Sequence, residues 1–545
     1  MDDLGFRANV SLILDANIEA GRGDKAAIRL GDEEVTYSQL LTLACRAGRA
    51  LAERGVRREE RVLLVLDDTP AFPAAFLGAI RIGAVPVPVN FMYKASDYVH
   101  FLADSYARLA VVDDAFAEKI AGAVAEYGGE VDLVAPADLL ADPGHETFDP
   151  VTTHEDDMAF WLYSSGSTGK PKGVVHRQAD VAATCETYGV HVLGLTDDDV
   201  TYSSSKLFHA YGLGNSMSFP FAVGATAVYT PGRPTPDGVF AAIERYRPSV
   251  FFCVPTLYNA LLNAPGARER DLSSVRRCLS AAEALPPEVL KRWQEFYAVP
   301  ILDAVGSTEM LHCYCANLPG ALRPGSSGRP IPGYELRIRD EDGTVLGPGA
   351  TGELLVKGDS ALGGYWHHRD KTRRTLVGEW FATGDRYRLD EDGYYWYEGR
   401  ADDMIKVGGL WASPIEIENV LMEHPAVLEA AVVGVDVDGF TRIRAHVICR
   451  PGVRGVPDEP GVRGGPDEPG VRGGPDEPGV RDIPDEPAAA PAGLDAELQE
   501  WCKSRLQRYQ YPHMVEFADE LPKTVTGKIQ RFMLRRPAVE QDETT

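Results

Sequence analysis

Residues 163–173 concentrate the side-chain types that bind phosphate. Within eleven residues the segment holds four aliphatic hydroxyls, three glycines and two lysines, directly after the apolar run 158–162. Glycines let backbone N–H groups approach a phosphate, hydroxyls donate to its oxygens, and lysines offset its charge. A Walker-A loop is excluded because Pro171 follows Gly169-Lys170, and Ser164 stands where that motif needs its first glycine. The segment predicts a different phosphate-binding loop, with a flexible surface loop as the alternative.

Thr308 and Glu309 carry a second set of groups suited to ATP. They follow a predicted strand, 301–304, and ligands of α/β proteins bind beyond the carboxyl ends of strands. A threonine hydroxyl donates to a phosphate, and a carboxylate binds Mg²⁺.

Three more segments fit the same chemistry. Asp385 ends a predicted tight turn, 381–385, and its carboxylate suits a ribose diol. Arg400 stands in a charged connector between two predicted domains, and Lys528 forms a second Gly-Lys pair near the C-terminus. Each segment alone is typical of a surface turn, but their combination and order indicate ATP-dependent activation of a carboxylate.

The elements that position these residues follow from apolar periodicity. Continuous apolar strands alternate with helical patterns, which predicts a parallel α/β architecture in the first 330 residues. The clearest examples are strands 61–66, 84–89, 225–229, 249–254 and 301–304, with helices 36–54, 71–83 and 239–246. Alternating strands at 334–339, 352–357 and 394–398 predict a β-rich subdomain. The tail returns to mixed α/β, with helices 414–422 and 494–506 and strands 428–435 and 445–449.

Residues 452–487 are four copies of the nonapeptide Gly-Val-Arg-x-x-Pro-Asp-Glu-Pro. The four copies share one aliphatic residue, two prolines and three charges, which is too little apolar surface to offset the entropy of ordering the backbone. The repeat predicts a disordered insert, with an interaction segment as the alternative.

Composition limits the classes of protein that remain. The 545 residues carry a net charge of −26, with 44% hydrophobic and 25% charged residues, which is typical of globular domains and disfavours nucleic acid as a partner. Eight cysteines are scattered without metal-site spacing and predict reduced thiols in the cytoplasm. We expect no signal peptide, because the N-terminus lacks a basic region, and no membrane span.

The motifs together resemble the adenylate-forming acyl-CoA synthetase superfamily, and the similarity covers nearly the whole chain apart from the repeat. Segments 206–215, 282–286, 306–312, 509–512 and 520–531 are similar to benzoate–CoA ligases and related aryl–CoA ligases. The resemblance implies an α/β fold with a large N-terminal domain, 1–400, built of α/β subdomains and a β-rich subdomain. A small mobile α+β C-terminal domain, 401–545, would follow, with a hinge at Asp402.

The resemblance also implies a reaction in two halves. The acid first attacks the α-phosphate of ATP, with Mg²⁺, to give an acyl adenylate and pyrophosphate. Coenzyme A then attacks the acyl carbon to give the thioester and AMP.

Roles for individual residues come from the same resemblance. Catalysis is assigned to Lys528, Thr308 and Glu309, and Glu309 would also bind the metal. The residues implied in ATP binding are Ser164, Ser165, Gly166, Ser167, Thr168, Gly169, Lys170, Lys172, Ala282, Glu283, Asp303, Thr308, Asp385, Arg400 and Lys528. The acyl pocket would consist of His209, Ala210, Tyr211, Gly306, His312 and Cys313, and coenzyme A would contact Gly408, Gly409 and Phe440.

One departure from the pattern concerns the acid. His209 stands where a benzoate ligase is expected to have Phe, which raises hydroxy- or aminobenzoate as substrates; a packed histidine without a substrate contact is the alternative. Two other functions stay open at this stage. One is an adenylating enzyme that loads an aryl acid onto a separate carrier protein, and the other is a nucleotide-binding regulator on the same scaffold. The expected protein is a monomer or homodimer.

Overall fold

The computed structural model describes residues 4–141, 147–164, 170–400, 402–407, 410–437, 440–450, 493–523 and 529–535. The chain divides into two compact units, Met1–Tyr397 and Glu398–Thr545, and the two units are described separately. The boundary between the two units, after Tyr397, lies close to the domain boundary expected at residue 400. The functional division into domains remains a prediction.

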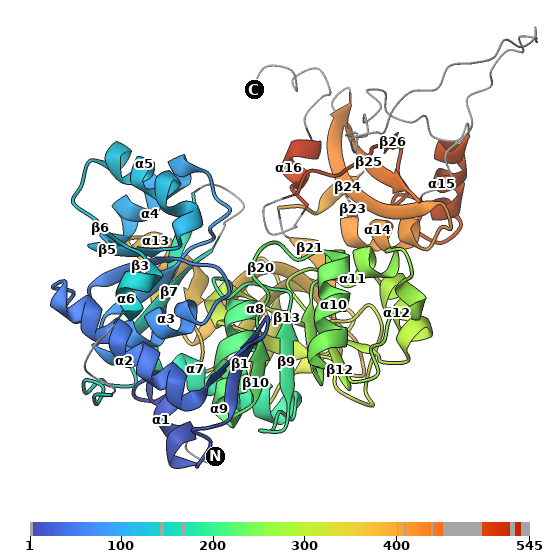
Figure 1. Ribbon diagram of the computed structural model, residues 1–545. Helices are drawn as coiled ribbons and strands as arrows, with labels where there is room; N and C mark the ends of the chain where they lie inside the picture. The colour runs from blue at the N-terminus through green and yellow to red at the C-terminus, as the bar shows by residue number, and fades with distance from the viewer. Residues whose placement is uncertain are drawn as a thin grey trace, which may run out of the picture. The chain divides into compact units, whose positions relative to one another are not determined.

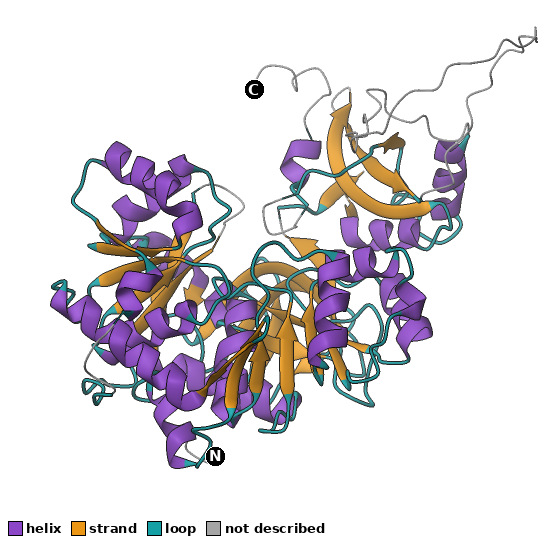
Figure 2. Ribbon diagram, in the orientation of Figure 1, coloured by secondary structure: helices purple, strands orange, loops and turns teal. Residues whose placement is uncertain are grey.

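The first unit contains two parallel sheets covered by helices (Figures 1 and 2). The larger has the strand order β15-β14-β13-β12-β11-β9-β10-β1-β2 and is parallel from β13 to β1. Its strands are β1 (Ala26–Leu30), β2 (Glu33–Thr36), β9 (Val200–Ser203), β10 (Thr226–Val228), β11 (Val250–Cys253), β12 (Arg277–Ser280), β13 (Ile301–Gly306), β14 (Cys313–Ala316) and β15 (Arg329–Pro330). The smaller has the order β4-β3-β5-β6, with β3 (Arg61–Val65), β4 (Val85–Pro88), β5 (Leu109–Val112) and β6 (Asp132–Val134).

Helices bury the apolar faces of these sheets. Their bounds are α1 (Leu12–Glu19), α2 (Tyr37–Glu53), α3 (Ala71–Arg81), α4 (Ala95–Ser105), α5 (Ala117–Tyr127), α6 (Pro136–Leu140), α7 (Gln178–Thr184), α8 (Ala210–Leu213), α9 (Phe219–Val223), α10 (Pro236–Tyr246), α11 (Pro255–Leu262) and α12 (Pro287–Tyr297), with shorter or wider turns η1 (Asp114–Phe116), η2 (Cys185–Val192), η3 (Gly214–Ser218), η4 (Ala267–Glu269) and η5 (Thr308–Met310). Thr36 caps α2 in a reciprocal capping box with Gln39. Helices α2 and α3 pack so closely that a Cβ at Gly78 would lie 2.5 Å from the Ala44 carbonyl oxygen.

Two antiparallel sheets complete the first unit. One is β18-β8-β7, with β7 (Met158–Ser164), β8 (Lys172–Arg177) and β18 (Gly364–Tyr365). The other joins β16 (Glu335–Arg339), β17 (Thr351–Lys357), β20 (Trp380–Leu389) and β19 (Leu376–Val377), and β21 (Tyr395–Arg400) pairs with β20; α13 (Arg369–Thr375) precedes β19. The predicted β-rich region after residue 330 is therefore confirmed.

The second unit is a small α+β domain. Its sheet is β24 (Val427–Val437), β25 (Phe440–Cys449) and β26 (Met514–Phe517), beside the hairpin β22 (Ile405–Val407) and β23 (Leu410–Ala412). Its helices are α14 (Pro414–Met422), α15 (Leu494–Lys503) and α16 (Arg531–Leu534). The nonapeptide repeat, 452–487, lies outside the described residues, so the prediction that it is disordered stays a prediction.

Two local predictions were wrong. Residues 381–385 are not a tight turn but part of β20, because Leu355 pairs with Ala382 whereas Glu353 pairs with Arg386, which leaves a bulge around Gly384 at φ 74°. Arg400 is the last residue of β21 and lies just after the boundary of the two units, so its place in a connector between domains stays a prediction. Phe440 begins β25 rather than lying in a loop, and its side chain is 66% exposed.

Candidate active site

The carboxyl ends of neighbouring strands bring the predicted site residues together. Strands β9, β12 and β13 run parallel in the large sheet, so the segments that follow them leave the sheet at the same edge. Those segments carry the acyl-pocket residues His209, Ala210 and Tyr211, the pair Ala282 and Glu283, and the turn with Thr308 and Glu309. The parallel strands that this expectation of a ligand site requires are therefore present in the structure.

The Thr308–Met310 turn is held in one geometry by its neighbours. Ser307 caps it through the Met310 N–H at 3.2 Å. The Glu309 carboxylate accepts hydrogen bonds from Ser164 Oγ at 3.2 Å and from Tyr365 OH at 2.9 Å, both on Oε1. Among the described residues, Oε2 receives no hydrogen bond, so this oxygen suits a magnesium ion shared with ATP.

Lysines gather beside this carboxylate. The pKa of Lys172 is lowered by burial and by the nearby Lys371, and Glu309 partly offsets the shift. Lys371, whose ammonium lies 5.2 Å from the Tyr365 ring centroid, was missed by the sequence analysis because nothing distinguished it within the basic segment 367–374. Two ammonium groups near one carboxylate form a cationic environment suited to triphosphate.

The predicted phosphate loop connects two paired strands. Ser164 ends β7 and pairs with Lys172 at the start of β8, which places the ends of the loop opposite each other. Lys170 is exposed, while Ser165, Gly166, Ser167, Thr168 and Gly169 lie outside the described residues. Their assignment to phosphate binding remains a prediction.

The segment after β12 has a strained backbone. Ala282 adopts φ 77°, a left-handed conformation that a non-glycine residue rarely takes and that is frequent at ligand sites. Glu283 accepts a hydrogen bond from Thr256 Oγ1 at 2.6 Å, which holds this segment to α11. Asp303 is on β13 and pairs in register with Ser280 of β12. Burial raises the pKa of Asp303 to about 8, although the Ser280 hydroxyl and two backbone N–H groups oppose the shift.

Asp303→Asn is expected to change how stability depends on pH. The native carboxyl keeps its proton up to about pH 8, whereas the unfolded one loses it near 3.8, so the native state binds more protons between these values. Stability therefore falls as pH rises through this window, by at most about 1.4 kcal/mol per pH unit from this group. Urea denaturation at pH 5 and pH 8 should show a smaller loss in the variant than in the wild type. Parallel losses would contradict the prediction, and the exposed Asp24→Asn serves as control.

Asp385 lies in the same region as Glu309. The hydroxyl of the buried Tyr314 has its pKa raised well above its usual value, first by burial and then by Asp385, with a smaller effect from Glu309. The Asp385 backbone N–H donates to Thr383 Oγ1 at 3.0 Å within the β20 bulge. A bulge changes which way the following side chains point, so it can direct the Asp385 carboxylate differently from a regular strand.

Three of the predicted acyl-pocket residues, Tyr211, Gly306 and Cys313, lie around His312. The rings of Phe219, Tyr188 and Tyr211 lie 4.5, 5.0 and 5.4 Å from it, centroid to centroid. Gly306 passes so close that a Cβ there would lie 2.5 Å from the His312 carbonyl oxygen. Flat aromatic walls and absent side chains suit a planar aryl group.

Two further residues complete this cluster. His312 Nε2 lies 3.2 Å from Asn215 Oδ1, and Tyr188 faces the thiol of Cys313. Burial lowers the pKa of His312 to about 3, so the ring is neutral at physiological pH. Tyr188 and Asn215 were not among the predicted site residues; Asn215 stood in a motif used for the resemblance, whereas Tyr188 had no sequence signal.

A buried ion cluster anchors the segment that carries His209. Lys206 Nζ lies 3.1 Å from Asp67 Oδ1 and 3.5 Å from Asp68 Oδ2, and it donates to the Thr230 carbonyl at 2.7 Å. Burial raises the pKa of Asp68 to about 6, and Lys206 opposes the rise. The Lys206 carbonyl accepts from the His209 N–H at 3.0 Å. The loop after β3 thereby positions residues 206–209.

The second unit carries the remaining predicted residues. The Asp402 carbonyl accepts a hydrogen bond from Arg535 at 3.3 Å, and Phe440 exposes most of its ring. Gly408, Gly409 and Lys528 lie outside the described residues. The hinge and the coenzyme A contacts therefore remain predictions.

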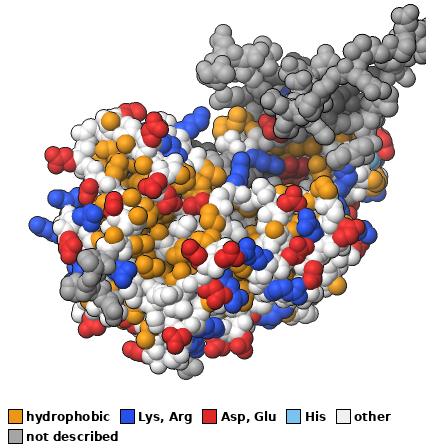
Figure 3. All heavy atoms as spheres, viewed as in Figure 1, with side chains coloured by type: hydrophobic (Ala, Val, Ile, Leu, Met, Phe, Trp, Pro, Cys, Tyr) orange, Lys and Arg blue, Asp and Glu red, His pale blue; other side chains and the backbone are white. Residues whose placement is uncertain are grey.

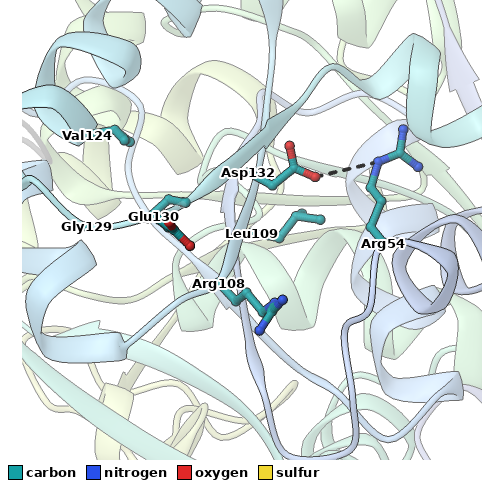
Figure 4. Close-up of a pocket in the computed structure, with 8 residues that line it drawn as sticks. Arg54, Arg108, Leu109, Val124, Gly129, Glu130 and Asp132 are labelled. Atoms are coloured by element: carbon teal, nitrogen blue, oxygen red, sulfur yellow. Dashed lines mark ion pairs between the residues drawn. The ribbon is translucent and has the colours of Figure 1, made fainter.

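A separate hollow of about 460 Å³ lies beside β6 and is lined by Arg54, Arg108, Asp132 and the end of α5 (Figure 4). Arg54 pairs there with Asp132 at 3.9 Å, and none of the predicted site residues line it. Figure 3 shows acidic and basic side chains intermingled on the viewed face of the first unit. In the described part of the chain, no cluster of three or more His, Cys, Asp and Glu side chains could hold a metal, and no helix is long and apolar enough to cross a membrane.

Comparison with known proteins connects this site to a family. Residues 15–366 match the AMP-binding enzyme model, and 416–462 with 477–528 match the AMP-binding enzyme C-terminal domain. The chain is 42% identical to a benzoate–CoA ligase of Thauera aromatica, covering 96% of this chain and 94% of that protein. It is 40% identical to a 4-hydroxybenzoate–CoA/benzoate–CoA ligase of Rhodopseudomonas palustris, covering 99% and 96%.

A solved structure agrees with the sequence matches. A benzoate CoA ligase from Burkholderia xenovorans LB400 superposes with a TM-score of 0.85 at 40% identity, covering 97% of this chain and all of that chain. The fold, the motifs and the matched lengths lead to one conclusion. The chain belongs to the AMP-binding enzyme family of adenylate-forming proteins.

Proposed function

We propose that this protein is an AMP-forming aryl–CoA ligase that activates a benzoate-type acid with ATP and transfers the acyl group to coenzyme A. One observation carries the proposal: the buried cluster of aromatic rings around His312 lies on the segment that directly follows the Thr308–Glu309 turn. The relatives named above are ligases of benzoate and 4-hydroxybenzoate, which supports an aryl acid as substrate.

The first half-reaction must bring two anions together. The carboxylate oxygen attacks the α-phosphate, a new P–O bond forms, and pyrophosphate leaves. In our proposal Thr308 donates to the α-phosphate, Lys172 with residues 164–170 holds the other phosphates, and Asp385 binds the ribose. Magnesium, when bound at Glu309, neutralises phosphate charge. Asp303 and the Ala282–Glu283 backbone are proposed to hold the adenine side.

The second half-reaction is assigned to a different arrangement of the C-terminal domain, 401–545. The thiol sulfur of coenzyme A bonds to the acyl carbon, and AMP leaves. We propose that Asp402 is the hinge, that Gly408 and Gly409 border the pantetheine, and that Phe440 stacks on coenzyme A. The 66% exposure of Phe440 supports a ligand contact for this ring. Arg400 is proposed to assist the nucleotide.

His209 is the residue proposed to select the substituent on the aromatic ring of the acid. We propose that its imidazole hydrogen-bonds a hydroxyl or amino group of the acid, a contact that Phe could not make. His209→Phe should lower the preference for hydroxy- or aminobenzoate over benzoate, measured as the ratio of kcat/KM values, by about tenfold, the value of one hydrogen bond. An unchanged ratio would instead favour a packed histidine.

The alternative function is the loading of an aryl acid onto a carrier protein. Thioester formation from an aryl acid, ATP and free coenzyme A, measured over a panel of substituted benzoates, tests the proposal directly. Adenylate formation without transfer to free coenzyme A would overturn it in favour of the carrier. We further propose that the protein is a monomer or homodimer without nucleic acid or membrane partners. We also propose a cytoplasmic location, which the eight free cysteines support.

A further inference from the structure

A buried histidine–aspartate pair lies behind the Thr308–Glu309 turn and has no role in the steps above. His176 is in β8 and Asp180 in α7, and both side chains are completely buried. His176 Nδ1 lies 3.1 Å from Asp180 Oδ2, and Nε2 lies 2.8 Å from the Thr308 carbonyl oxygen. The imidazole thus bridges the helix that follows the phosphate-loop hairpin and the proposed catalytic turn.

Both partners of this imidazole are hydrogen-bond acceptors. A peptide carbonyl oxygen has no proton to donate. The Asp180 carboxylate already accepts from the Arg177 N–H at 3.0 Å on Oδ2 and from Arg177 Nε at 3.1 Å on Oδ1, so both of its oxygens act as acceptors. A neutral imidazole has a single N–H and could serve only one of these two acceptors. Both bonds form only when Nδ1 and Nε2 are both protonated.

A positive charge on the buried His176 ring would be stabilised by its neighbours in the first unit. Asp180 supplies the opposite charge, and the Phe160 ring lies 5.3 Å from the imidazole, centroid to centroid, at 28°. Arg177, the other cation on Asp180, also pairs with Asp156 at 3.3 Å, so the cluster of two cations and two carboxylates is balanced. A paired and hydrogen-bonded charge is tolerated in an interior where an isolated one is not.

The imidazole is one of three supports of the same turn. The Thr308 carbonyl accepts from His176, the Glu309 carbonyl from the Leu362 N–H at 2.8 Å, and the Met310 carbonyl from Ser360 Oγ at 2.7 Å. Three successive carbonyls are therefore held from β8 and from residues 360–362. Because the donors come from outside the turn, they set where the Thr308 hydroxyl and the Glu309 carboxylate lie.

We propose that His176 is a buried imidazolium that positions the Thr308–Glu309 turn for the adenylation step. This inference rests on the proposed function for its catalytic consequence, but not for the protonation state of the ring. His176 is a positioning residue, because it contacts the turn through its backbone and does not touch the reacting atoms.

Neutron diffraction from a deuterium-exchanged crystal of the full chain tests the protonation directly. We expect nuclear density for hydrogen isotopes on both Nδ1 and Nε2 of His176 near neutral pH. Density on only one ring nitrogen would overturn the proposal. This measurement needs no variant and no activity, so it separates a failure of the inference from a failure of the proposed function.

Kinetics test the positioning role. His176→Gln keeps at most one of the two hydrogen bonds, since an amide presents its oxygen as well as its nitrogen. We expect kcat for ATP–pyrophosphate exchange to fall about tenfold or more, with a higher magnesium requirement and an unchanged KM for the aryl acid. The exposed His191→Gln is the matched control and should leave all three values unchanged. A folded His176→Gln with unchanged kcat and magnesium requirement would overturn the positioning role.

Discussion

Lys528→Ala is expected to lose about 10²-fold or more of its adenylation rate while it retains the thioester-forming half-reaction. The proposed ammonium lies between the carboxylate and the α-phosphate and stabilises charge as the new bond forms. Lys528 itself lies outside the described residues, but the chain on either side is anchored. Lys523 pairs with Glu429 at 2.8 Å, and Arg531 pairs with the buried Glu418 at 2.7 Å.

Because the flanking residues are held in place, a loss of activity in Lys528→Ala can be assigned to the missing ammonium group rather than to unfolding. Leu521 and Leu534 belong to the core of the second unit, and Lys523 forms a β-bridge with Ile529, so the short segment between them starts and ends at held positions. A truncated side chain there should not unfold the unit. ATP–pyrophosphate exchange measures the first half-reaction, and coenzyme A with a supplied aryl adenylate measures the second. An equal loss in both would refute the assigned role, and Lys523→Ala is a control for general damage to this region.

Glu309→Gln is expected to lower kcat/KM for ATP about 10²-fold and to raise the magnesium concentration needed for half-maximal rate. The amide keeps the size of the side chain and still accepts from Ser164 and Tyr365 on its oxygen. It removes the negative charge that attracts the metal. The variant therefore tests charge rather than packing, and initial rates across a magnesium titration measure the effect.

Tyr365→Phe is the matched control for Glu309→Gln. It deletes the hydroxyl that donates to Glu309 Oε1 at 2.9 Å but leaves the carboxylate charged. We expect a loss of about 5- to 30-fold, with the magnesium requirement nearly unchanged, because a single positioning hydrogen bond contributes about 1–2 kcal/mol. If Tyr365→Phe shifts the magnesium titration as far as Glu309→Gln does, orientation rather than charge explains the role of Glu309.

The sequence predicted several helices and strands close to their observed bounds, and it identified the family. Helix 414–422 has the predicted bounds, and strands 61–66 and 301–304 differ from the observed ones by at most two residues. Apolar periodicity and capping residues are local properties of the chain, so they can be read without tertiary contacts. The motifs similarly identified the AMP-binding enzyme family, because their order along the chain is specific.

Residues 381–385 show where local reasoning failed. Thr383, Gly384 and Asp385 are turn-forming types, and their sequence predicts a tight turn. The structure places them in a bulge of β20, because pairing with β17 continues on both sides of the bulge. Partner strands far away in the chain thus overrode the local preference.

What only the tertiary structure decided is how distant residues combine at the site. The sequence alone determined that Ser164, Thr308, Glu309 and Asp385 could bind a nucleotide, since residue type and order carry that information. The fold decided that Tyr365 and Ser164 share one oxygen of Glu309, that Tyr188 faces Cys313, and that His176 reaches the Thr308 carbonyl. These contacts join residues more than fifty positions apart in the sequence. The number of hydrogen-bond acceptors around a histidine ring depends on tertiary packing, so the sequence alone could not predict it.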